Sequence, residues 1–491
     1  MTTEAELNSV TVEASPPEAA EERQSWGALF VVLAGLFITG IDFFIVNVAI
    51  PSLQQKMHAS SAEIQFVSAG FNIGLSAMLI TGGRLGDLYG RRRIFSIGVA
   101  VFTAASLACG TAPNMGELIA ARVVQGIAAA MVIPQVLGIL TTAYTGKHRV
   151  TAFNGYALTL GASAIFGQLL GGLLIKANVF DWDWRTIFLI NVPLGLAILL
   201  LAPRVVPESK SEGRTGMDLV GVVLVTAGLT AIVLPLVQGR QDGWPTWTWV
   251  SMAAAVPLLA VFWWQQRRLA ARGKSPLVNP SLFHDRAFSV GVVSIFVNFL
   301  VMASFFLVLA LYLQEGRGLS PLMSGLLFAP LGLGFFLASG VAPKLAASMG
   351  KQVLALGALV MAVGDVGLAE TVTHLHSSPT AWCIPTMMVV GAGMGLVVAP
   401  LISLILQNVA PEHAAAASGV FSTSQEMANA VGIAIVGAVF FTVASHHGGT
   451  HGYPTAFGSS LYLQAGILVA LGALVQLLPG KSAAVQAAPQ D

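Results

Sequence analysis

The sequence predicts an all-α membrane protein with fourteen transmembrane helices, arranged as two six-helix halves with two extra helices between them. Three observations predict this class: composition, long apolar stretches and an internal repeat. Of the 491 residues, 55% are hydrophobic and 10% are charged, whereas a soluble domain carries about 25% charged residues. A soluble multidomain enzyme is therefore excluded, and the net charge of +1 argues against nucleic acid as a partner.

Fourteen apolar stretches are long enough to cross a bilayer, which requires about 20 residues per helix. Their predicted ranges, in chain order, are 27–50, 62–82, 94–111, 117–141, 151–175, 186–203, 217–237, 249–266, 288–313, 321–343, 352–371, 380–407, 414–443 and 459–479. The acidic segment 1–25 lacks the basic start and short apolar core of a cleaved signal peptide. We therefore expect a disordered tail there, and the first stretch to remain as a membrane helix.

The distribution of Lys and Arg orients these helices. If both termini lie in the cytoplasm, 18 of the 24 basic residues fall on cytoplasmic segments, five fall on external segments and Arg122 alone falls within a stretch. This asymmetry satisfies the positive-inside rule. We therefore expect a multi-pass protein of the bacterial cytoplasmic membrane with both termini cytoplasmic.

An internal repeat divides the chain. GIAAAMVIP, ending at Pro134, resembles GAGMGLVVAP, ending at Pro400, and KHRVTAFNG resembles PEHAAAASG in the same order. Repeated halves around a midplane site are typical of secondary transporters. The expected organisation is a tail at 1–25, an N-terminal half at 26–203, a linker with two extra transmembrane helices at 204–287, a C-terminal half at 288–479 and a cytoplasmic tail at 480–491.

The segment after the second stretch, GRLGDLYGRRR at 83–93, places one acid among four arginines and between glycines. Such an aspartate can cap a neighbouring helix terminus and pair with a base. We expect this loop to hold one conformation of the protein and to release it, whereas the alternative is a turn with a basic topology signal. The residues assigned to this gating loop are Gly83, Asp87, Gly90, Arg91 and Arg92.

Ionisable residues inside the stretches mark a second candidate site, because a charge at the bilayer centre costs at least about 2.5–3.5 kcal/mol. Asp42 and Arg122 are predicted at matching depths, which allows an ion pair across a cavity; a purely structural pair is the alternative. Glu426, near the middle of the thirteenth stretch, is expected to carry a proton or to attract a cationic substrate. A protonated carboxyl that only bonds a neighbouring helix is the alternative. Asp365, in the eleventh stretch, is a further cavity candidate.

Several segments resemble the motifs of the major facilitator superfamily, in its fourteen-helix drug:proton antiporter branch. They are the charged loop at 83–93, GIDFFIVNVAIP at 40–51, RVVQGIAAA at 122–130, WRTIFLINVPLG at 184–195 and LYLQEGRGLSPLMSGLLFAP at 311–330. The resemblance implies proton-driven export of amphipathic, often cationic compounds by rocking of two six-helix halves. It also implies that Asp42 and Arg122 take part in proton coupling. We assign Phe44, Asn47 and Gln125 to a cavity of mixed apolar and polar lining.

The fifth stretch departs from that family's antiporter motif, G-x-x-x-G-P-x-x-G-G. Ser163 replaces the first glycine and Gln168 replaces the proline, while Gly167, Gly171 and Gly172 are retained. Small residues at i, i+4 and i+8 still allow close helix packing, although the kink that proline would introduce is lost. This departure keeps a proton-coupled symporter for uptake open as an alternative.

We therefore expect a monomeric, non-enzymatic exporter that uses the proton motive force, without a cofactor or a metal site. The two Gly-Lys-Ser triplets, at 273–275 and 480–482, lack the earlier glycine of a phosphate-binding loop, which argues against an ATP-driven pump. The two cysteines lie far apart in apolar stretches, so they indicate no metal centre. A membrane sensor without transport is the remaining alternative.

Overall fold

The computed structural model describes residues 25–178, 181–210, 217–239, 243–274, 276–319, 321–374, 380–406, 409, 414–446 and 452–478. Across these ranges the regular structure is helical and no strand is formed, which confirms the all-α prediction. The predicted C-terminal tail at 480–491 and all but the last residue of the predicted N-terminal tail lie outside the described residues.

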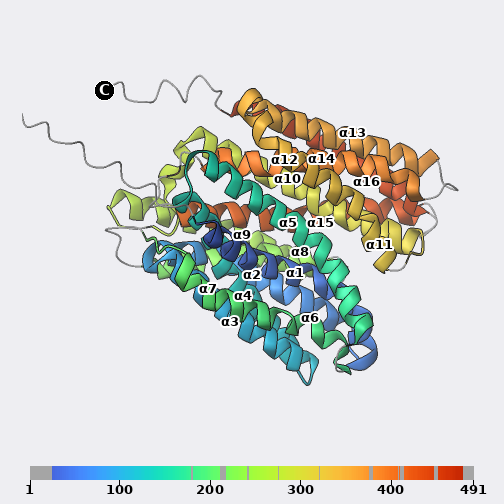
Figure 1. Ribbon diagram of the computed structural model, residues 1–491, viewed down its shortest axis with the longest axis horizontal. Helices are drawn as coiled ribbons and strands as arrows, with labels where there is room; N and C mark the ends of the chain where they lie inside the picture. The colour runs from blue at the N-terminus through green and yellow to red at the C-terminus, as the bar shows by residue number, and fades with distance from the viewer. Residues whose placement is uncertain are drawn as a thin grey trace, which may run out of the picture.

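The helices form two bundles joined by a helical pair (Figure 1). The first bundle contains α1 (Trp26–Lys56), α2 (Ser61–Tyr89), α3 (Arg91–Thr111), α4 (Met115–Ala143), α5 (Gly146–Ala177), α6 (Thr186–Leu189) and α7 (Asn191–Val205). The second contains α10 (Arg286–Leu311), α11 (Pro321–Leu327), α12 (Ala329–Met349), α13 (Gln352–His374), α14 (Ile384–Leu406), α15 (Ala414–His446) and α16 (Tyr453–Leu474). Between them, α8 (Leu219–Gln238) packs on α9 (Thr246–Ala271) and on α2, where the Thr226 hydroxyl donates to the Ala77 carbonyl oxygen at 2.9 Å.

Capping residues fix where several helices begin. Ser60 accepts a hydrogen bond from the Glu63 backbone N–H, and the Glu63 carboxylate accepts one from the Ser60 N–H at 2.9 Å, which forms a capping box at the start of α2. Asn114 caps α4, Asp218 caps α8 and Asp285 caps α10 through their side-chain oxygens. These contacts satisfy backbone donors that the first helical turn leaves without partners.

Among the described residues, twelve helical stretches are long and apolar enough to cross a membrane. Helices α2 and α5, with 29 and 32 residues, are not in that group. The structure therefore confirms a multi-pass helical protein with about twelve apolar spans.

Several predicted boundaries were wrong. Helix α2 continues through most of the predicted loop at 83–93 and ends at Tyr89, because the chain turns only at Gly90, whose φ is +104°. The stretch at 186–203 is broken into a 3₁₀ turn (Asp183–Arg185), α6 and α7, and the stretch at 321–343 into α11 and α12. Helix α10 ends in a π-helical turn at Tyr312–Gly316. Apolar patterning does not reveal the breaks between α6 and α7 or between α11 and α12, because apolar residues lie on both sides of each break. The end of α2 was misplaced for a different reason, because the charged residues at 83–93 are typical of a loop.

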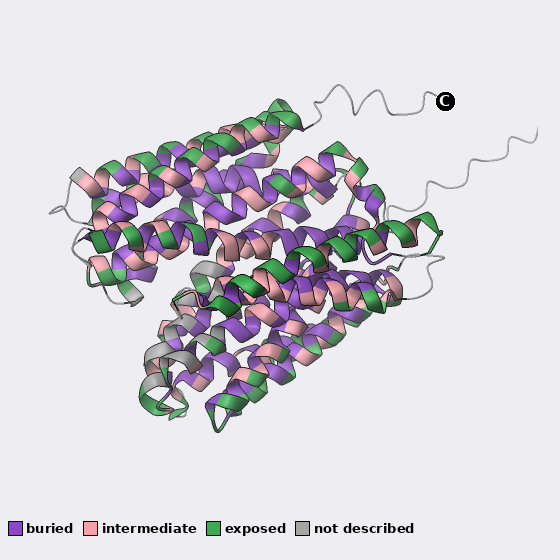
Figure 2. Ribbon diagram, turned by 180° about the vertical axis from the view of Figure 1, so that it is seen from behind, coloured by how far each residue is buried: buried purple, intermediate pink, exposed green. Residues whose placement is uncertain are grey.

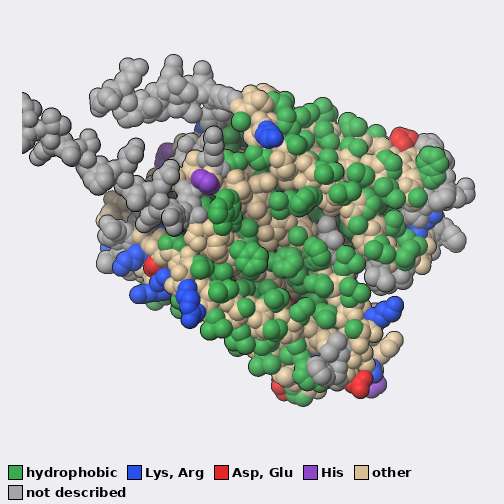
Figure 3. Space-filling view, viewed as in Figure 1, with side chains coloured by type: hydrophobic (Ala, Val, Ile, Leu, Met, Phe, Trp, Pro, Cys, Tyr) green, Lys and Arg blue, Asp and Glu red, His purple; other side chains and the backbone are tan. Residues whose placement is uncertain are grey.

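The two bundles meet at the end where α1 begins and α16 finishes, which we call the terminal end, and they diverge toward the opposite, far end (Figures 1 and 2). Buried residues follow the interior of each bundle (Figure 2). On the face shown in Figure 3, charged side chains gather near the two ends and a broad apolar surface lies between them. That surface is the arrangement expected of a protein surrounded by lipid.

Candidate functional site

The carboxylate of Asp42 on α1 and the guanidinium of Arg122 on α4 form an ion pair inside the first bundle. Arg122 also donates from Nη1 to Gln125 Oε1 at 2.8 Å and from Nε to the Val67 carbonyl oxygen on α2 at 3.1 Å. Asp42 is 0% exposed and Arg122 is 1% exposed. The structure thus brings together the two charges that the sequence placed at matching depths, but within one bundle and not across an open cavity.

Three polar side chains complete this arrangement. Gln125 donates from Nε2 to Asp42 Oδ1 at 2.9 Å and to Ser106 Oγ on α3 at 2.7 Å. Asn191, the first residue of α7, donates to Asp42 Oδ1 at 2.8 Å. We call Asp42, Ser106, Arg122, Gln125 and Asn191 the core cluster. Gln125 was predicted to line the cavity, but it is fully buried in this cluster because its amide is needed to satisfy the Asp42 carboxylate.

Ser106 and Asn191 were not predicted from the sequence. Asn191 lies in WRTIFLINVPLG, where a side-chain amide follows an apolar run, and that contrast was the available signal. Ser106 carried no such signal, since small polar residues are common in membrane helices.

Two aromatic rings flank the guanidinium of the core cluster. The Arg122 carbon Cζ lies 4.6 Å from the Phe71 ring centroid and 5.7 Å from that of Phe188. Cation–π contacts stabilise a desolvated guanidinium independently of any carboxylate. Arg122 therefore has favourable contacts with two aromatic rings in addition to its ion pair with Asp42.

Asp87, in the last turn of α2, connects the two bundles. Its Oδ1 accepts a hydrogen bond from Arg91 Nη2 at 2.7 Å, and its Oδ2 accepts one from the backbone N–H of Ala416 at 2.9 Å. Ala416 lies in the first turn of α15, where the positive end of the helix dipole favours a carboxylate. We call Asp87, Arg91 and Ala416 the latch. Its contacts are the helix cap and charge pair that the sequence predicted for Asp87.

The segment that follows α7 braces the latch. The Glu208 carboxylate accepts a hydrogen bond from the Arg92 backbone N–H at 3.0 Å and lies 3.7 Å and 3.8 Å from the Nε atoms of Arg92 and Arg93. Arg91 donates from its backbone N–H to the Ser209 carbonyl oxygen at 2.9 Å and from Nη1 to Ser209 Oγ at 3.1 Å. Glu208 and Ser209 were not predicted from the sequence, because they lie more than 100 positions from the loop and no local pattern indicates contact with it.

Gly90 has a structural requirement for glycine, since its φ is +104° and a Cβ there would lie 2.6 Å from Glu208 Oε1. Gly83, also assigned to the gating loop, is a buried helical residue of α2.

Further contacts between the bundles lie at the terminal end. Arg149 on α5 donates to the carbonyl oxygen of Leu406, the last residue of α14, at 2.5 Å. A Cβ on Gly419 of α15 would lie 3.1 Å from the Leu79 carbonyl oxygen, so α15 packs closely on the backbone of α2. Together with the latch, these contacts hold the terminal end closed.

Comparison with known proteins identifies the family. The sequence profile described as Major Facilitator Superfamily matches residues 32–433. The chain belongs to this superfamily. The predicted resemblance is therefore confirmed, and the chain is a membrane transporter and not an enzyme.

Curated members of the superfamily are similar to this chain over most of its length. A protein named probable actinorhodin transporter, from Streptomyces coelicolor, is 36% identical over 433 residues, which cover 87% of this chain and 74% of that protein. The puromycin resistance protein of Streptomyces alboniger is 31% identical over 494 residues, covering 96% and 95%. The crystal structure of the human organic anion transporter MFSD10 aligns with a TM-score of 0.66 at 13% identity and covers 94% of this chain and all of that one, which shows the shared fold.

The small residues of the superfamily's fifth-span motif lie between α1 and α5. A Cβ on Gly167 would lie 2.8 Å from the Cβ of Phe44, and one on Gly40 would lie 2.6 Å from Ser163 Oγ. Gly171 is buried and Gly172 is half-buried on the same helix. The stripe thus lets α5 approach α1, the helix that carries Asp42. Phe44 is half-buried there, whereas the side chain of Asn47, predicted to line the cavity, lies outside the described residues.

The two acids of the second bundle lie in different surroundings. Glu426 on α15 is partly exposed, forms a side-chain hydrogen bond with Asn429 and interacts electrostatically with Tyr156 of α5, in the other bundle. Glu426 thus interacts with a residue of the other bundle, and its position in a central cavity stays a prediction. Asp365 on α13 is fully buried. This burial differs from the expectation that Asp365 lines a substrate cavity, because a side chain without exposed surface does not border an open space.

Within the described part of the chain, no group of three or more His, Cys, Asp or Glu side chains converges on one point. Cys109 and Cys383 are both buried and lie in different bundles. The described residues thus offer no candidate metal centre.

Proposed function

We propose that this chain exports small amphipathic or cationic molecules, antibiotics among them, in exchange for protons. Its superfamily membership and the names of its relatives, which include an actinorhodin transporter and a puromycin resistance protein, support export of such compounds. The observation that carries proton exchange is the buried Asp42 carboxylate, held by Arg122, Gln125 and Asn191 from two other helices.

Asp42 is suited to couple a proton to movement. While ionised, it accepts hydrogen bonds from α4 and α7 and thereby ties α1 to both helices. Protonation removes the charge that attracts Arg122 and weakens these bonds, since hydrogen bonds to charged groups are roughly twice as strong as neutral ones. A proton on Asp42 therefore loosens the contact of α1 with α4 and α7.

We expect protonation of Asp42 to shift an equilibrium between two conformations, one with the latch closed and one with the latch open. In the structure, the bundles are joined at the terminal end and diverge at the far end (Figure 1). If the termini are cytoplasmic, this arrangement corresponds to an outward-facing transporter. The cluster of bases at 91–93 near the terminal end supports that orientation through the positive-inside rule. Opening the latch would expose the site between the bundles to the cytoplasm.

Fourteen crossings are also part of this proposal. Helices α2 and α5 have 29 and 32 residues, more than the ~20 that a bilayer crossing needs, and they pack on α4 and α1 within the first bundle. Adding them to the twelve apolar spans gives two six-helix halves with α8 and α9 between them. The core cluster is complete within one chain, which is consistent with a monomer and needs no cofactor.

The proton motive force is sufficient for such export. A membrane potential of ~100 mV supplies about 2.3 kcal/mol per charge, and each pH unit adds about 1.36 kcal/mol per proton. One proton per neutral substrate molecule would thus sustain a concentration ratio on the order of a hundredfold.

Everted membrane vesicles test the proposal. Respiration acidifies their lumen, and puromycin or ethidium is then added outside. An antiporter takes the compound into the lumen and releases protons, so the pH gradient falls in vesicles that contain the protein and not in vesicles that lack it. A symporter would instead carry protons inward with the compound, and a sensor would leave the gradient unchanged. Either of these two results would contradict exchange.

A further inference from the structure

Asp365 is a buried acid that the proposed mechanism does not use. Its side chain is fully buried in the middle of α13, and neither Oδ1 nor Oδ2 has a hydrogen-bond partner among the described residues. An ionised carboxylate without donors is strongly disfavoured in an apolar interior. The arrangement therefore requires a neutral carboxyl or a bound cation.

Among the described residues, no base interacts with this acid. The two helices that form most of the packing around α13 are α14 and α16, and neither contains Asp, Glu, Lys, Arg or His. Lys344 on α12 and Arg286 on α10 lie at the terminal end of their helices, away from the middle of α13. On α13 itself, Glu370 is exposed and accepts a hydrogen bond from the Tyr462 hydroxyl at 2.6 Å.

Gln464 on α16 lies at the same depth as Asp365. Helices α13 and α16 are antiparallel, and their register is fixed by the hydrogen bond from Gln352 to Gln476 at 2.9 Å and by that from Tyr462 to Glu370. In an antiparallel pair, each step forward along one helix corresponds to a step back along the other. Starting from either contact, residue 464 of α16 therefore lies opposite residues 364–368 of α13. Gln464 is fully buried, and its Oε1 has no hydrogen-bond partner among the described residues.

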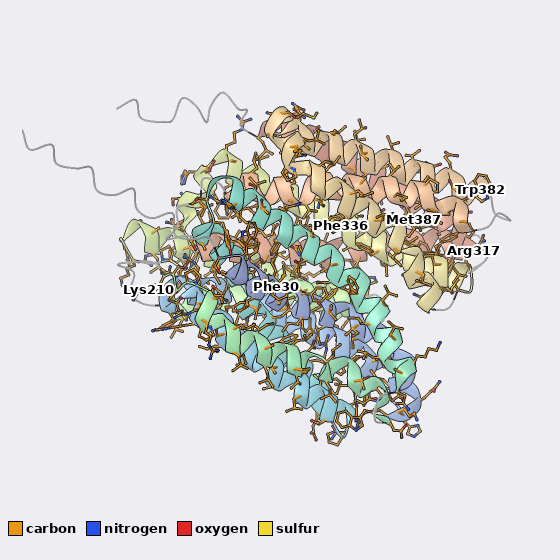
Figure 4. The ribbon with its side chains drawn as sticks, in the orientation of Figure 1. Phe30, Lys210, Arg317, Phe336, Trp382 and Met387 are labelled. Atoms are coloured by element: carbon orange, nitrogen blue, oxygen red, sulfur yellow. The ribbon has the colours of Figure 1, made fainter. Side chains whose placement is uncertain are left out.

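The neighbouring helices complete a polar layer at this depth. Gln464 Nε2 donates to Ser304 Oγ on α10 at 3.0 Å, which fixes the direction of the amide. Gly364, the residue before Asp365, packs on Val390 of α14. Val390 lies about one helical turn after Met387, which is labelled in the second bundle in Figure 4. A carboxylate that can only accept and an amide oxygen without a donor thus lie at one depth inside the second bundle, and one proton shared between them would satisfy both.

We propose that Asp365 is a second proton-binding site, whose protonated carboxyl donates a hydrogen bond to Gln464 Oε1. The proton is bound and released in each transport cycle together with the proton on Asp42, so that two protons are exchanged per substrate molecule. The proposal rests on the proposed proton-coupled function and adds its stoichiometry. Deprotonated Asp365 would favour a conformation of the second bundle that admits water, which couples this bundle to the cycle.

Proteoliposomes with the membrane potential set to zero and a pH difference of one unit test the stoichiometry. With ethidium as substrate, exchange of two protons sustains a ratio of about 100-fold, and exchange of one proton sustains about 10-fold. We expect the former for the wild type and for the control Glu370→Gln, an exposed acid on the same helix, and the latter for Asp365→Asn. A wild-type ratio of about 10-fold, or the same ratio in Asp365→Asn as in the wild type, would overturn the proposal.

Infrared difference spectroscopy of the purified protein provides a readout that does not depend on transport. The carbonyl stretch of a protonated carboxyl group should be present in the wild type and in Glu370→Gln, lose one component in Asp365→Asn, and shift in Gln464→Met. If Asp365 instead holds a sodium ion, that component is absent and exchange depends on sodium, which would overturn the proposal. The two failures are distinguishable, because a wild type without pH-driven exchange contradicts the proposed function, whereas a missing carboxyl component contradicts the assignment of Asp365.

Discussion

Replacing Asp87 with Ala should open the terminal end of the transporter. The substitution removes the hydrogen bond between Asp87 Oδ2 and the Ala416 N–H, a 2.9 Å contact that joins the two bundles. A hydrogen bond to a charged group contributes about 1.5–3 kcal/mol. Because this bond exists only while the terminal end is closed, its loss shifts the closed–open equilibrium by about 10- to 150-fold, at 1.4 kcal/mol per tenfold change.

The contact with Arg91 has a different effect. It lies within the first bundle, so its loss lowers the stability of both conformations, although Arg91 keeps its bond to Ser209 Oγ at 3.1 Å. Asp87→Ala should therefore combine a lower unfolding temperature with a displaced conformational equilibrium, and substrate affinity should change little.

Distance measurements between two spin labels separate these effects. Arg204 on α7 and Lys344 on α12 are exposed, lie near the terminal end and belong to different bundles. Cysteines introduced there can be labelled selectively, because the natural Cys109 and Cys383 are buried. The wild-type background should show mainly the short distance, and the Asp87→Ala background should add a longer one.

Glu117→Gln is the matched control, since it removes an exposed acid at the far end, where its carboxylate accepts only from Asn114. It should leave the distance distribution unchanged. A folded Asp87→Ala protein with the wild-type distribution and normal turnover would refute the latch, and Asp87 would then act only in stabilising the first bundle.

Three further predictions follow from the sites. Asp42→Asn keeps one acceptor oxygen for Gln125 and Asn191 but places an NH2 donor where Arg122 now finds an acceptor, and it removes the titration. The pH-driven efflux should therefore be lost while the protein still folds and inserts into the membrane; efflux at the wild-type rate would contradict the role of Asp42. Glu426→Gln should reduce efflux of a divalent cationic substrate more than that of a matched monovalent one, and equal retention of both would leave Glu426 as a packing residue. Gly90→Ala should cost about 1–3 kcal/mol of stability, because the positive φ is strained and Glu208 is displaced. Thermal unfolding checks this against Gly146→Ala, whose φ is also positive but whose surroundings are open, and equal losses would show that Glu208 plays no part.

The sequence alone was sufficient to predict the membrane class, the helical fold and the family. Apolar length is a local property, because each membrane helix satisfies its own backbone hydrogen bonds and must be apolar wherever it meets lipid. The pairing of Asp42 with Arg122 was also predictable, since two opposite charges inside apolar helices have few other partners. The break between α6 and α7 was not predictable, because apolar residues lie on both sides of it. The continuation of α2 to Tyr89 was not predictable either, because the charged residues at 83–93 are typical of a loop.

Only the tertiary structure decided how these residues are used. Asn191 reaches Asp42 across 149 positions of sequence, and Glu208 reaches Arg92 across 116. Ser106 joins the core cluster by accepting hydrogen bonds from Gln125 and Asn191. Helix packing and not local pattern brings these side chains together. For Asp365 too, the sequence predicted one property and the tertiary structure decided another. Its sequence predicted a costly acid in a membrane helix, whereas the packing of α13 against α14 and α16 decided that this acid is fully buried. A sequence fixes how apolar a helix is, but the direction that each polar side chain faces depends on the neighbours against which that helix packs.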